Sequence, residues 1–281
     1  MVVRRLHGRA SAACATTVAL LVCAASATGC SNSGAAAEDA RSASGSLALL
    51  RQASAALVRA GSSRARTSME MATGGTRVTI RGEGVYDFRG RLGRLTVTLP
   101  QDPTGAQEHR PITELLAAGA LFMKNRGAGV PPDKWVRVDT ATLSDGNLVT
   151  GGATDPYTAA ELLRGVREAT YVGRTEIDGT AVRHYRGITD IGRAARRAAE
   201  GDKGALRAAA RGFATAEVPF DAYLDAEGRI RKLRQRFGFV NGDRKTTVAV
   251  TSTTVLYGFG APAEVVLPAA GDIFAGKIAE R

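Results

Sequence analysis

The residues best suited to chemistry in this sequence are two histidines, His109 and His184, which follow the N-terminal segment. A histidine can act as a general base beside a serine and an aspartate, or it can bind zinc. His109 lies in a polar stretch that predicts a loop, and His184 lies in an alternating stretch that predicts a strand. No Gly-x-Ser-x-Gly elbow accompanies them, and their spacing does not suit zinc. We therefore predict no catalytic residue.

Acidic residues near the C-terminal end offer a second chemistry, because Asp221, Asp225 and Glu227 precede Gly228. Carboxylates grouped before a glycine are typical of calcium loops, but these do not follow the Asp-x-Asp-x-Asp-Gly spacing. A strand that ends in a turn accounts for them better. Gly82-x-Gly84 lies within strands and opens no helix, so it is not a phosphate loop. The sequence predicts no metal, no cofactor and no enzyme.

Cys30 is the residue with the clearest predicted chemistry. A basic start with Arg4, Arg5 and Arg9 precedes an apolar stretch from about Ala12 to Ala27, as in a secretory signal. The stretch is shorter than the roughly 20 apolar residues of a transmembrane helix. It ends in Ala27-Thr28-Gly29-Cys30, which resembles a lipobox with Ala27 at the place of the usual Leu. We predict a lipoprotein signal peptide over 1–29 and lipidation of Cys30. The alternative is an ordinary signal peptide with a chance cysteine.

The composition after Cys30 predicts a tether and one domain. Residues 30–45 are rich in Ser, Ala and Gly and cannot bury enough surface to fold. A flexible tether over 30–45 and a single domain over 46–281 are expected. Because Cys14 and Cys23 lie in the signal, the exported chain keeps no cysteine pair for a disulfide.

The charge balance bears on partners. The 38 basic residues exceed the 27 acidic ones by 11, and removal of the three signal arginines leaves an excess of 8. Nucleic acid is a common partner of basic chains, but export and the lack of a dense basic run argue against it. Attraction to an anionic membrane is one interpretation. An Arg-rich composition inherited from a GC-rich genome is the other.

Hydrophobic periodicity predicts the elements. A helix is expected over 46–60 and another from Asp155-Pro156, with Asp as the N-cap. A helical region over 190–213 is expected to break between Gly201 and Gly204. Alternating stretches predict antiparallel strands, listed by number as 67–71, 77–88, 95–99, 112–116, 120–124, 135–138, 171–177, 182–186, 218–224, 230–239 and 246–257. The order predicts an α+β fold with helices on one face of a large antiparallel sheet.

The C-terminal half carries a pattern of strands and turns that resembles a known family. It runs through Gly173-Arg174-Thr175-Glu176-Ile177-Asp178-Gly179, Val182-Arg183-His184-Tyr185-Arg186-Gly187, Val218-Pro219-Phe220-Asp221-Ala222-Tyr223-Leu224-Asp225 and Gly228-Arg229-Ile230-Arg231-Lys232-Leu233. This is similar to the actinobacterial LppX/LprA/LprF/LprG lipoprotein family, which itself resembles LolA-type carriers. The resemblance covers roughly 46–260, and residues 127–132 depart from it by adding a loop.

The resemblance implies a curved antiparallel half-barrel whose helices pack on the concave side and enclose an apolar cavity. It also implies binding of acylated lipids or glycolipids and their movement across the cell envelope. Alternation indicates which residues face inward, and each is either plain core or part of a lipid-cavity lining. They are Met69, Met71, Val78, Ile80, Leu95, Val97, Val218, Phe220, Ala222, Leu224, Leu233, Phe237, Phe239, Val248 and Val250.

A basic face is expected on the helical region, from Arg193, Arg196 and Arg197 to Lys203, Arg207 and Arg211. It is either a solvated face or, at Arg193, Arg196 and Arg197, a contact for anionic headgroups.

The sequence predicts a lipid-anchored protein on the extracytoplasmic face of the cell membrane that binds a lipid or acylated glycolipid. An envelope transporter is a further candidate partner. The alternative is a non-enzymatic envelope sensor or interaction protein with the same fold and a filled core.

Overall fold

The computed structural model describes residues 44–73, 76–100, 110–241 and 246–276. All of them fall within one compact unit over 39–281. The predicted signal peptide, Cys30 and almost all of the tether lie outside the described residues. His109 also lies outside them.

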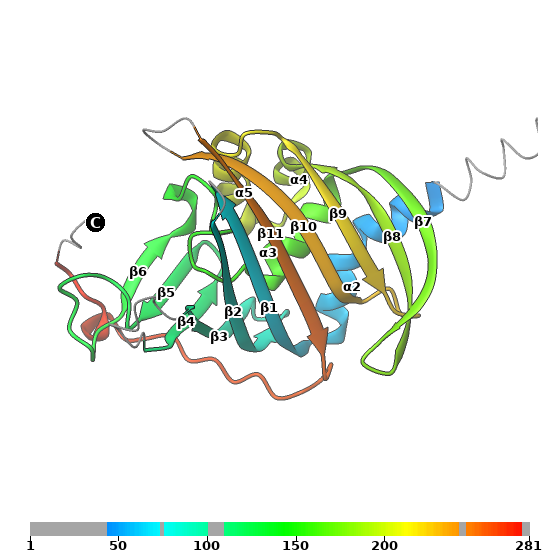
Figure 1. The fold of residues 1–281 in the computed structure, drawn as a ribbon. Coiled ribbons are helices and arrows are strands. Elements are labelled where there is room, and N and C mark those ends of the chain that lie inside the picture. Colours follow the sequence, from blue (N-terminus) through cyan, green and yellow to red (C-terminus); the bar gives the residue numbers. More distant parts are fainter. Residues whose placement is uncertain (1–43, 74–75, 101–109, 242–245, 277–281) are drawn as a thin grey trace, which may run out of the picture. The chain divides into compact units, whose positions relative to one another are not determined.

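The described strands form one antiparallel, eleven-stranded sheet (Figure 1). Its order is β6-β5-β4-β3-β2-β1-β11-β10-β9-β8-β7, so β6 and β7 are its two edges and the sheet is not closed. The strands are β1 (Ser62–Thr73), β2 (Thr76–Asp87), β3 (Leu92–Thr98), β4 (Ile112–Ala117), β5 (Ala120–Lys124), β6 (Val136–Asp139), β7 (Val166–Ile177), β8 (Thr180–Asp190), β9 (Glu217–Leu224), β10 (Ile230–Asn241) and β11 (Thr246–Tyr257).

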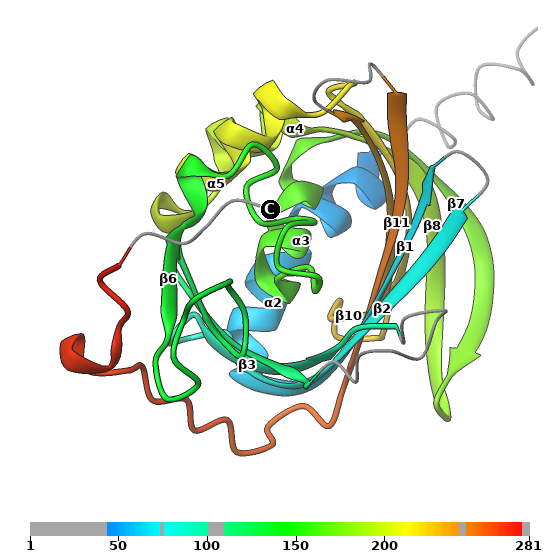
Figure 2. The ribbon, with the colours of Figure 1, turned by 60° about the vertical axis from the view of Figure 1, so that its left-hand side comes forward.

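Helices occupy the inside of the curve. Figure 2 shows the sheet bending around α2 and α3, with α4 and α5 along the opening. Residues 44–51 are also helical and lead through a turn at Gln52 into α2. The itemised helices and 3₁₀ turns are α2 (Ala53–Ala60), η1 (Thr140–Thr142), α3 (Pro156–Leu162), η2 (Leu163–Gly165), α4 (Ile191–Arg197), α5 (Glu200–Gly212) and η4 (Ala270–Asp272). The predicted curved antiparallel half-barrel with helices on its concave face is confirmed.

The strands follow from the alternation in the sequence, since neighbouring side chains of a strand point to opposite faces. In β11, every second residue from Val248 to Leu256 is buried, including Ser252 and Thr254, while the residues between them are exposed or half-buried. Outward positions on β1 and β2 carry charged side chains such as Arg66 and Arg81. The sheet therefore has one mainly apolar face toward the helices and one polar face toward solvent.

The helix break lies at a different place from the one predicted. Gly201 and Gly204 sit inside α5, and the chain leaves the helix at Ala198 and Ala199, which are extended. The Ala199 N–H donates to a carboxylate oxygen of Glu161 at 2.7 Å, which replaces a helical hydrogen bond. A Cβ at Gly201 would lie 2.8 Å from the Cβ of Ala118. The glycines thus permit close packing, and Glu161 ends α4.

The chain after β11 crosses the outer face of the sheet. Trp135 exchanges backbone hydrogen bonds with Asp272 and Phe274, both at 2.8 Å. A small outer cluster of Leu115, Ala120 and Phe122 packs against this segment. Figure 1 shows the segment running below β1 to β4 toward β6. The apolar outer side of β4 and β5 is thereby covered.

Candidate functional site

The predicted lining residues share the concave face of the sheet. Register pairs Met71 with both Val78 and Val250, and it pairs Phe237 with Val250. Directly paired residues of antiparallel strands point to the same face. Buried members of the set are Met69, Ile80, Leu95, Val97, Val218, Phe220, Ala222, Leu224, Leu233, Phe237, Val248 and Val250. Met71 and Val78 are half-buried. The backbone of Phe239 pairs with that of Val248.

These residues pack with the helices into one continuous core. The cluster includes Leu57 of α2, Leu162 of α3 and Leu206 of α5 together with the buried lining residues. Aromatic rings add to it, because Tyr86 lies 5.0 Å from Phe88 and 6.5 Å from Tyr157 between ring centroids. In this conformation the concave face is in contact with protein side chains.

The helix faces that cover the sheet are rich in alanine, which makes up about half of the buried residues on α2, α3, α4 and α5. Their buried residues include Ala53 and Ala56 on α2, Ala159 and Ala160 on α3, Ala194 and Ala195 on α4, and Ala205, Ala208 and Ala209 on α5. An alanine side chain loses far less contact area on leaving a core than a leucine does. Each helix thus combines one or two large buried side chains, such as Leu57 of α2 and Leu206 of α5, with alanines that each contribute little contact area.

A polar loop enters the concave side between η1 and α3. Asp145 accepts hydrogen bonds from the N–H groups of Val149 and Thr150, at 2.8 and 2.5 Å. The loop lies against the apolar face, since a Cβ at Gly152 would lie 3.4 Å from Ile80 and Val97. The sequence analysis assigned no role to this loop. Its signal is the run from Asp145 to Asn147, which is typical of a side-chain-stabilised turn.

Glu114 is a buried carboxyl beneath this loop. Its side chain is 0% exposed, and neither carboxyl oxygen has a hydrogen-bond partner among the described residues. Burial raises the pKa of Glu114 to about 8, against an opposing effect of Arg126. A Cβ at Gly151 would lie 3.1 Å from one of its oxygens, so the loop covers it closely. The carboxyl is largely protonated at neutral pH.

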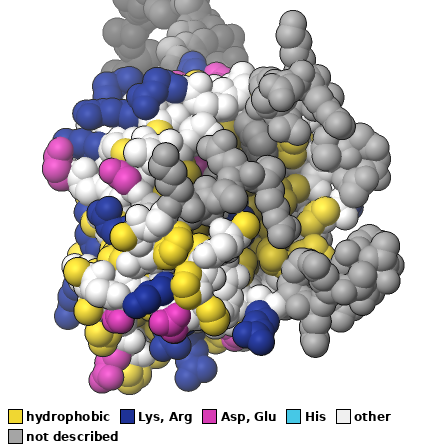
Figure 3. Space-filling model, turned by 90° about the vertical axis from the view of Figure 1, so that its left-hand side faces the viewer, with side chains coloured by type: hydrophobic (Ala, Val, Ile, Leu, Met, Phe, Trp, Pro, Cys, Tyr) yellow, Lys and Arg dark blue, Asp and Glu magenta, His cyan; other side chains and the backbone are white. Residues whose placement is uncertain are grey.

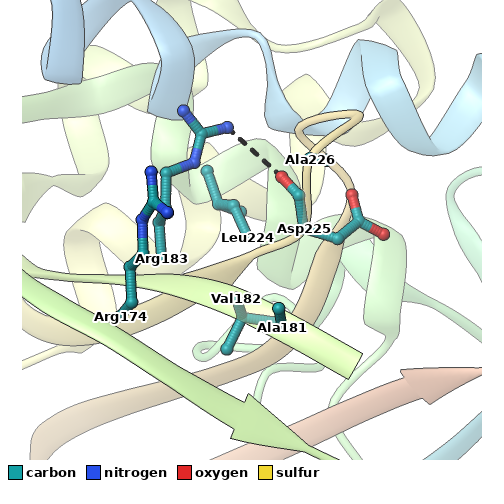
Figure 4. Close-up of a pocket in the computed structure, with 7 residues that line it drawn as sticks. All are labelled: Arg174, Ala181, Val182, Arg183, Leu224, Asp225 and Ala226. Atoms are coloured by element: carbon teal, nitrogen blue, oxygen red, sulfur yellow. Dashed lines mark hydrogen bonds between the residues drawn. The ribbon is translucent and has the colours of Figure 1, made fainter. Parts of the chain in front are cut away.

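A surface pocket of about 340 Å³ lies between the β7–β8 hairpin and the end of β9 (Figure 4). We call it the hairpin pocket. It is lined by Arg174, Ala181, Val182, Arg183, Leu224, Asp225 and Ala226. Figure 4 shows the two arginine side chains lying side by side and pointing the same way. The pocket combines apolar walls with two positive charges.

Other depressions are more polar. One of about 240 Å³ is formed by Arg110, Asn125 and Arg126 with residues of the loop 127–132 that departs from the family resemblance. Another of about 340 Å³ lies on the outer face between Trp135 and the C-terminal segment. The residues that line these two depressions include none of the predicted lipid-cavity residues of the concave face.

The basic residues on α4 lie beside a further arginine. Arg51 donates to the Val166 carbonyl at 2.7 Å, and Arg197 donates to the Arg164 carbonyl at 3.3 Å. Burial and the charges of Arg193 and Arg197 lower the pKa of Arg51. We call Arg51, Arg193, Arg196 and Arg197 the α4 basic patch. Within the described part of the chain, none of the four has an acidic side-chain partner.

The rest of the predicted basic face is separated from this patch by the helix break. Lys203 on α5 pairs with Glu200 at 2.6 Å, while Arg207 and Arg211 are exposed. Figure 3 shows Lys and Arg side chains gathered at the upper left, over α4 and α5.

The chemistry-bearing residues of the outer face form ion pairs. Asp221 contacts His184 at 2.9 Å, Arg186 at 3.0 Å and Arg236 at 3.0 Å. Burial opposes its ionisation, but these three hydrogen bonds outweigh burial and hold the pKa of Asp221 below its usual value. Asp225 instead pairs with Arg229, so the two carboxylates do not converge. No group of three metal-ligating side chains occurs among the described residues.

The anchor prediction concerns residues outside the described ranges. Within those ranges, the structure contains no helix of the length and apolarity that a membrane crossing requires.

Comparisons with known proteins give structural matches alone. No family model matches the chain, and no curated protein matches it. The lipoprotein LppX of Mycobacterium tuberculosis is similar with a TM-score of 0.46 and 11% identity, over 78% of this chain and 97% of that chain. LprF of Mycobacterium bovis is similar with a TM-score of 0.38 and 14% identity, over 80% and 97%. Both names appear in the family resemblance drawn from the sequence.

A third match is a domain of Vibrio parahaemolyticus assigned to outer membrane lipoprotein sorting. Its TM-score is 0.32 and its identity 9%, over 75% of this chain and 92% of that chain.

Proposed function

We propose that this protein is a non-enzymatic lipoprotein, anchored through Cys30 on the extracytoplasmic face of the cell membrane, that binds a lipid or acylated glycolipid. The acyl chains would lie between the concave face of the sheet and the helices. The protein would then carry the lipid across the cell envelope, with or without a transporter partner.

One observation carries the proposal: an open, curved sheet presents a mainly apolar face to helices, and about half of the buried residues of these helices are alanine. Each methylene group removed from water contributes about 0.8 kcal/mol, so ten of them contribute about 8 kcal/mol. An acyl chain therefore offsets the loss of many alanine contacts. Because the sheet has two free edges, the helices can separate from it without breaking a strand pairing.

Lipid content tests the proposal. The full chain, made in bacteria and purified in mild detergent, should carry lipid in native mass spectrometry and take up a long-chain phospholipid after delipidation. Met71→Gln with Val78→Gln places amides on the half-buried, paired positions of the concave face and should lower uptake. The matched control is Glu70→Gln with Thr79→Gln, the neighbouring pair on the outer face. A wild-type chain that carries and takes up no lipid contradicts the proposal.

A second candidate is an envelope sensor or interaction protein with the same fold and a filled core. The observation in its favour is the packing of Tyr86, Phe88 and Tyr157 inside the curve. The same experiment separates the two, because this candidate predicts a lipid-free protein.

A further inference from the structure

We propose that the hairpin pocket binds the charged headgroup of an anionic lipid, with Arg174 and Arg183 as the headgroup ligands. This inference deepens the proposed function and depends on it. It names a site and a class of lipid for a protein whose proposed acyl-binding face is mainly apolar.

The two arginines are paired across the hairpin. Arg174 of β7 lies opposite Arg183 of β8 in the register, so both side chains project from the same face. Figure 4 shows them extending in parallel from the strands. Two guanidinium groups held in this way can bind one phosphate or carboxylate through several hydrogen bonds.

The nearby acid does not neutralise them. Asp225 lines the pocket, but its carboxylate accepts hydrogen bonds from the Arg229 backbone N–H at 2.9 Å and side-chain Nε at 2.8 Å. Arg183 donates to the Asp225 backbone carbonyl at 3.2 Å. Among the described residues, neither Arg174 nor Arg183 forms an ion pair. Two like charges therefore face the pocket without a counter-charge.

The pocket walls suit the apolar part of an amphiphile. Val182 and Leu224 are buried in its walls, and Ala181 and Ala226 are exposed at its edge. A free inorganic anion gains little from such walls, whereas the first carbons of an acyl chain would cover them. The ligand class that matches both features is an anionic amphiphile.

An apolar path leads from the pocket toward the core. Tyr185 is two residues beyond Arg183 on the same face of β8, and its ring lies 5.5 Å from that of Tyr171. Tyr185 pairs with Ala222 of β9, a core residue of the concave face. Tyr171 and Val172 are 45% and 51% exposed, so apolar surface beside the hairpin is open to solvent. An acyl chain whose headgroup is held by the arginines could lie along these tyrosines.

The experiment measures binding to the delipidated full chain by native mass spectrometry titration. The probes are dihexanoyl phosphatidylglycerol, dihexanoyl phosphatidylcholine and inorganic phosphate. Tighter binding of phosphatidylglycerol than of either other probe is expected. If phosphatidylcholine bound as tightly as phosphatidylglycerol, the headgroup charge would play no part in binding. If inorganic phosphate bound as tightly, the pocket would be a site for simple anions. Either result overturns the inference.

Two variants identify the pocket. Arg174→Gln with Arg183→Gln should raise the dissociation constant for phosphatidylglycerol about tenfold, as expected for loss of a charged hydrogen bond. The matched control, Arg77→Gln with Arg81→Gln on the exposed outer face of β2, should leave it unchanged. Ala181→Asp, at an exposed position, should weaken binding by repulsion without disturbing the core. Equal affinity of all variants overturns the inference.

The outcomes also separate this inference from the proposed function. If the wild-type chain takes up lipid and the arginine variants bind phosphatidylglycerol as well as it does, the headgroup site is wrong and lipid binding stands. If the wild-type chain binds neither phospholipid and carries none, the proposed function fails as well.

Discussion

Glu114 is the residue whose environment departs most from what its type prefers. A carboxyl that is 0% exposed and has no described hydrogen-bond partner is stable only when it is protonated. Its place on β4 follows the strand alternation, but the loop that carries Gly151 and Gly152 covers it. A polar group in this position makes the stability of the fold depend on pH.

The prediction for Glu114 concerns the pH dependence of unfolding. The pKa is about 8 in the folded chain and about 4.5 in its ordinary state, so the folded chain holds the extra proton between these values. The free energy of unfolding should therefore fall as pH rises from 4.5 to 8, by on the order of 4 kcal/mol if Glu114 acted alone. Denaturant unfolding at a series of pH values measures this dependence.

Glu114→Gln should remove this dependence and raise stability at pH 8. Glu176→Gln, which changes an exposed carboxyl on β7, is the control. It should change neither the pH dependence of unfolding nor the stability at pH 8. A wild-type chain whose stability is flat over this pH range would contradict the assignment.

At the scale of elements, α3 depends on one capping residue. Asp155 accepts hydrogen bonds from the N–H groups of Tyr157 at 2.8 Å and Thr158 at 3.2 Å, and Pro156 occupies the first turn. The sequence predicted this cap, and the structure confirms it. All residues of the helix are buried, so its first N–H groups cannot turn to water for hydrogen bonds.

Asp155→Ala should destabilise the protein by about 1–2 kcal/mol, the usual cost of losing an N-cap. Thermal and denaturant unfolding measure it. Asp155→Asn keeps a capping acceptor and should recover most of the loss. If the asparagine variant is as unstable as the alanine variant, the carboxylate charge and not the cap is responsible.

The α4 basic patch is the second element-scale feature. The sequence predicted one basic face over 193–211, and the break at Ala198 and Ala199 divides it. The arginines of α4 then join Arg51, which is distant in sequence. Unpaired like charges on one surface favour an anionic partner such as a lipid bilayer.

Charge reversal tests the patch. Arg193→Glu, Arg196→Glu and Arg197→Glu together should weaken binding to anionic vesicles strongly, since each basic residue near such a surface contributes about 1 kcal/mol. Vesicle sedimentation with the chain started at Ser31 measures this without an anchor. Arg77→Glu, Arg81→Glu and Arg94→Glu on the outer face are the matched control. Equal loss in both triple variants would mean that overall charge, and not the patch, drives binding.

At the scale of the whole molecule, the open sheet is the feature from which the proposed function follows. The sheet ends at β6 and β7, so the space inside its curve is bounded along one side by helices and not by strands. The helices pack on the sheet through alanines together with a few large side chains such as Leu57 and Leu206. Binding would therefore involve movement of helices over a sheet that keeps its hydrogen bonds.

The anchor is a prediction about the whole chain in the cell. Cys30→Ala should abolish the mass increase of a diacylglyceryl group and leave the signal residues attached. Intact-mass measurement of the protein from a bacterial membrane fraction checks both points. Ser31→Ala, which leaves Cys30 in place, is the control and should be processed normally. A mature chain that begins elsewhere than at Cys30 contradicts the lipobox.

The sequence by itself determined which residues face the concave side, because side-chain alternation is a local property of a strand. Met69, Phe220 and Leu233 could be assigned inward before any strand pairing was known, and the register agrees. The Asp155 cap and the Asp178-Gly179 turn are local in the same sense. Cys30 and its lipidation also rest on local sequence, and they remain a prediction.

Only the tertiary structure decided what depends on residues distant in sequence. The helix ends at Ala198 because Glu161 reaches Ala199, and Gly201 lies inside α5, where it permits the close approach of Ala118. The burial of Glu114 depends on the distant loop that carries Gly151, and the pairing of Arg174 with Arg183 depends on the register of a hairpin with a bulge. Periodicity reports how a segment alternates between two faces, but contacts between segments decide which charges meet, which groups lose water and where a pocket forms.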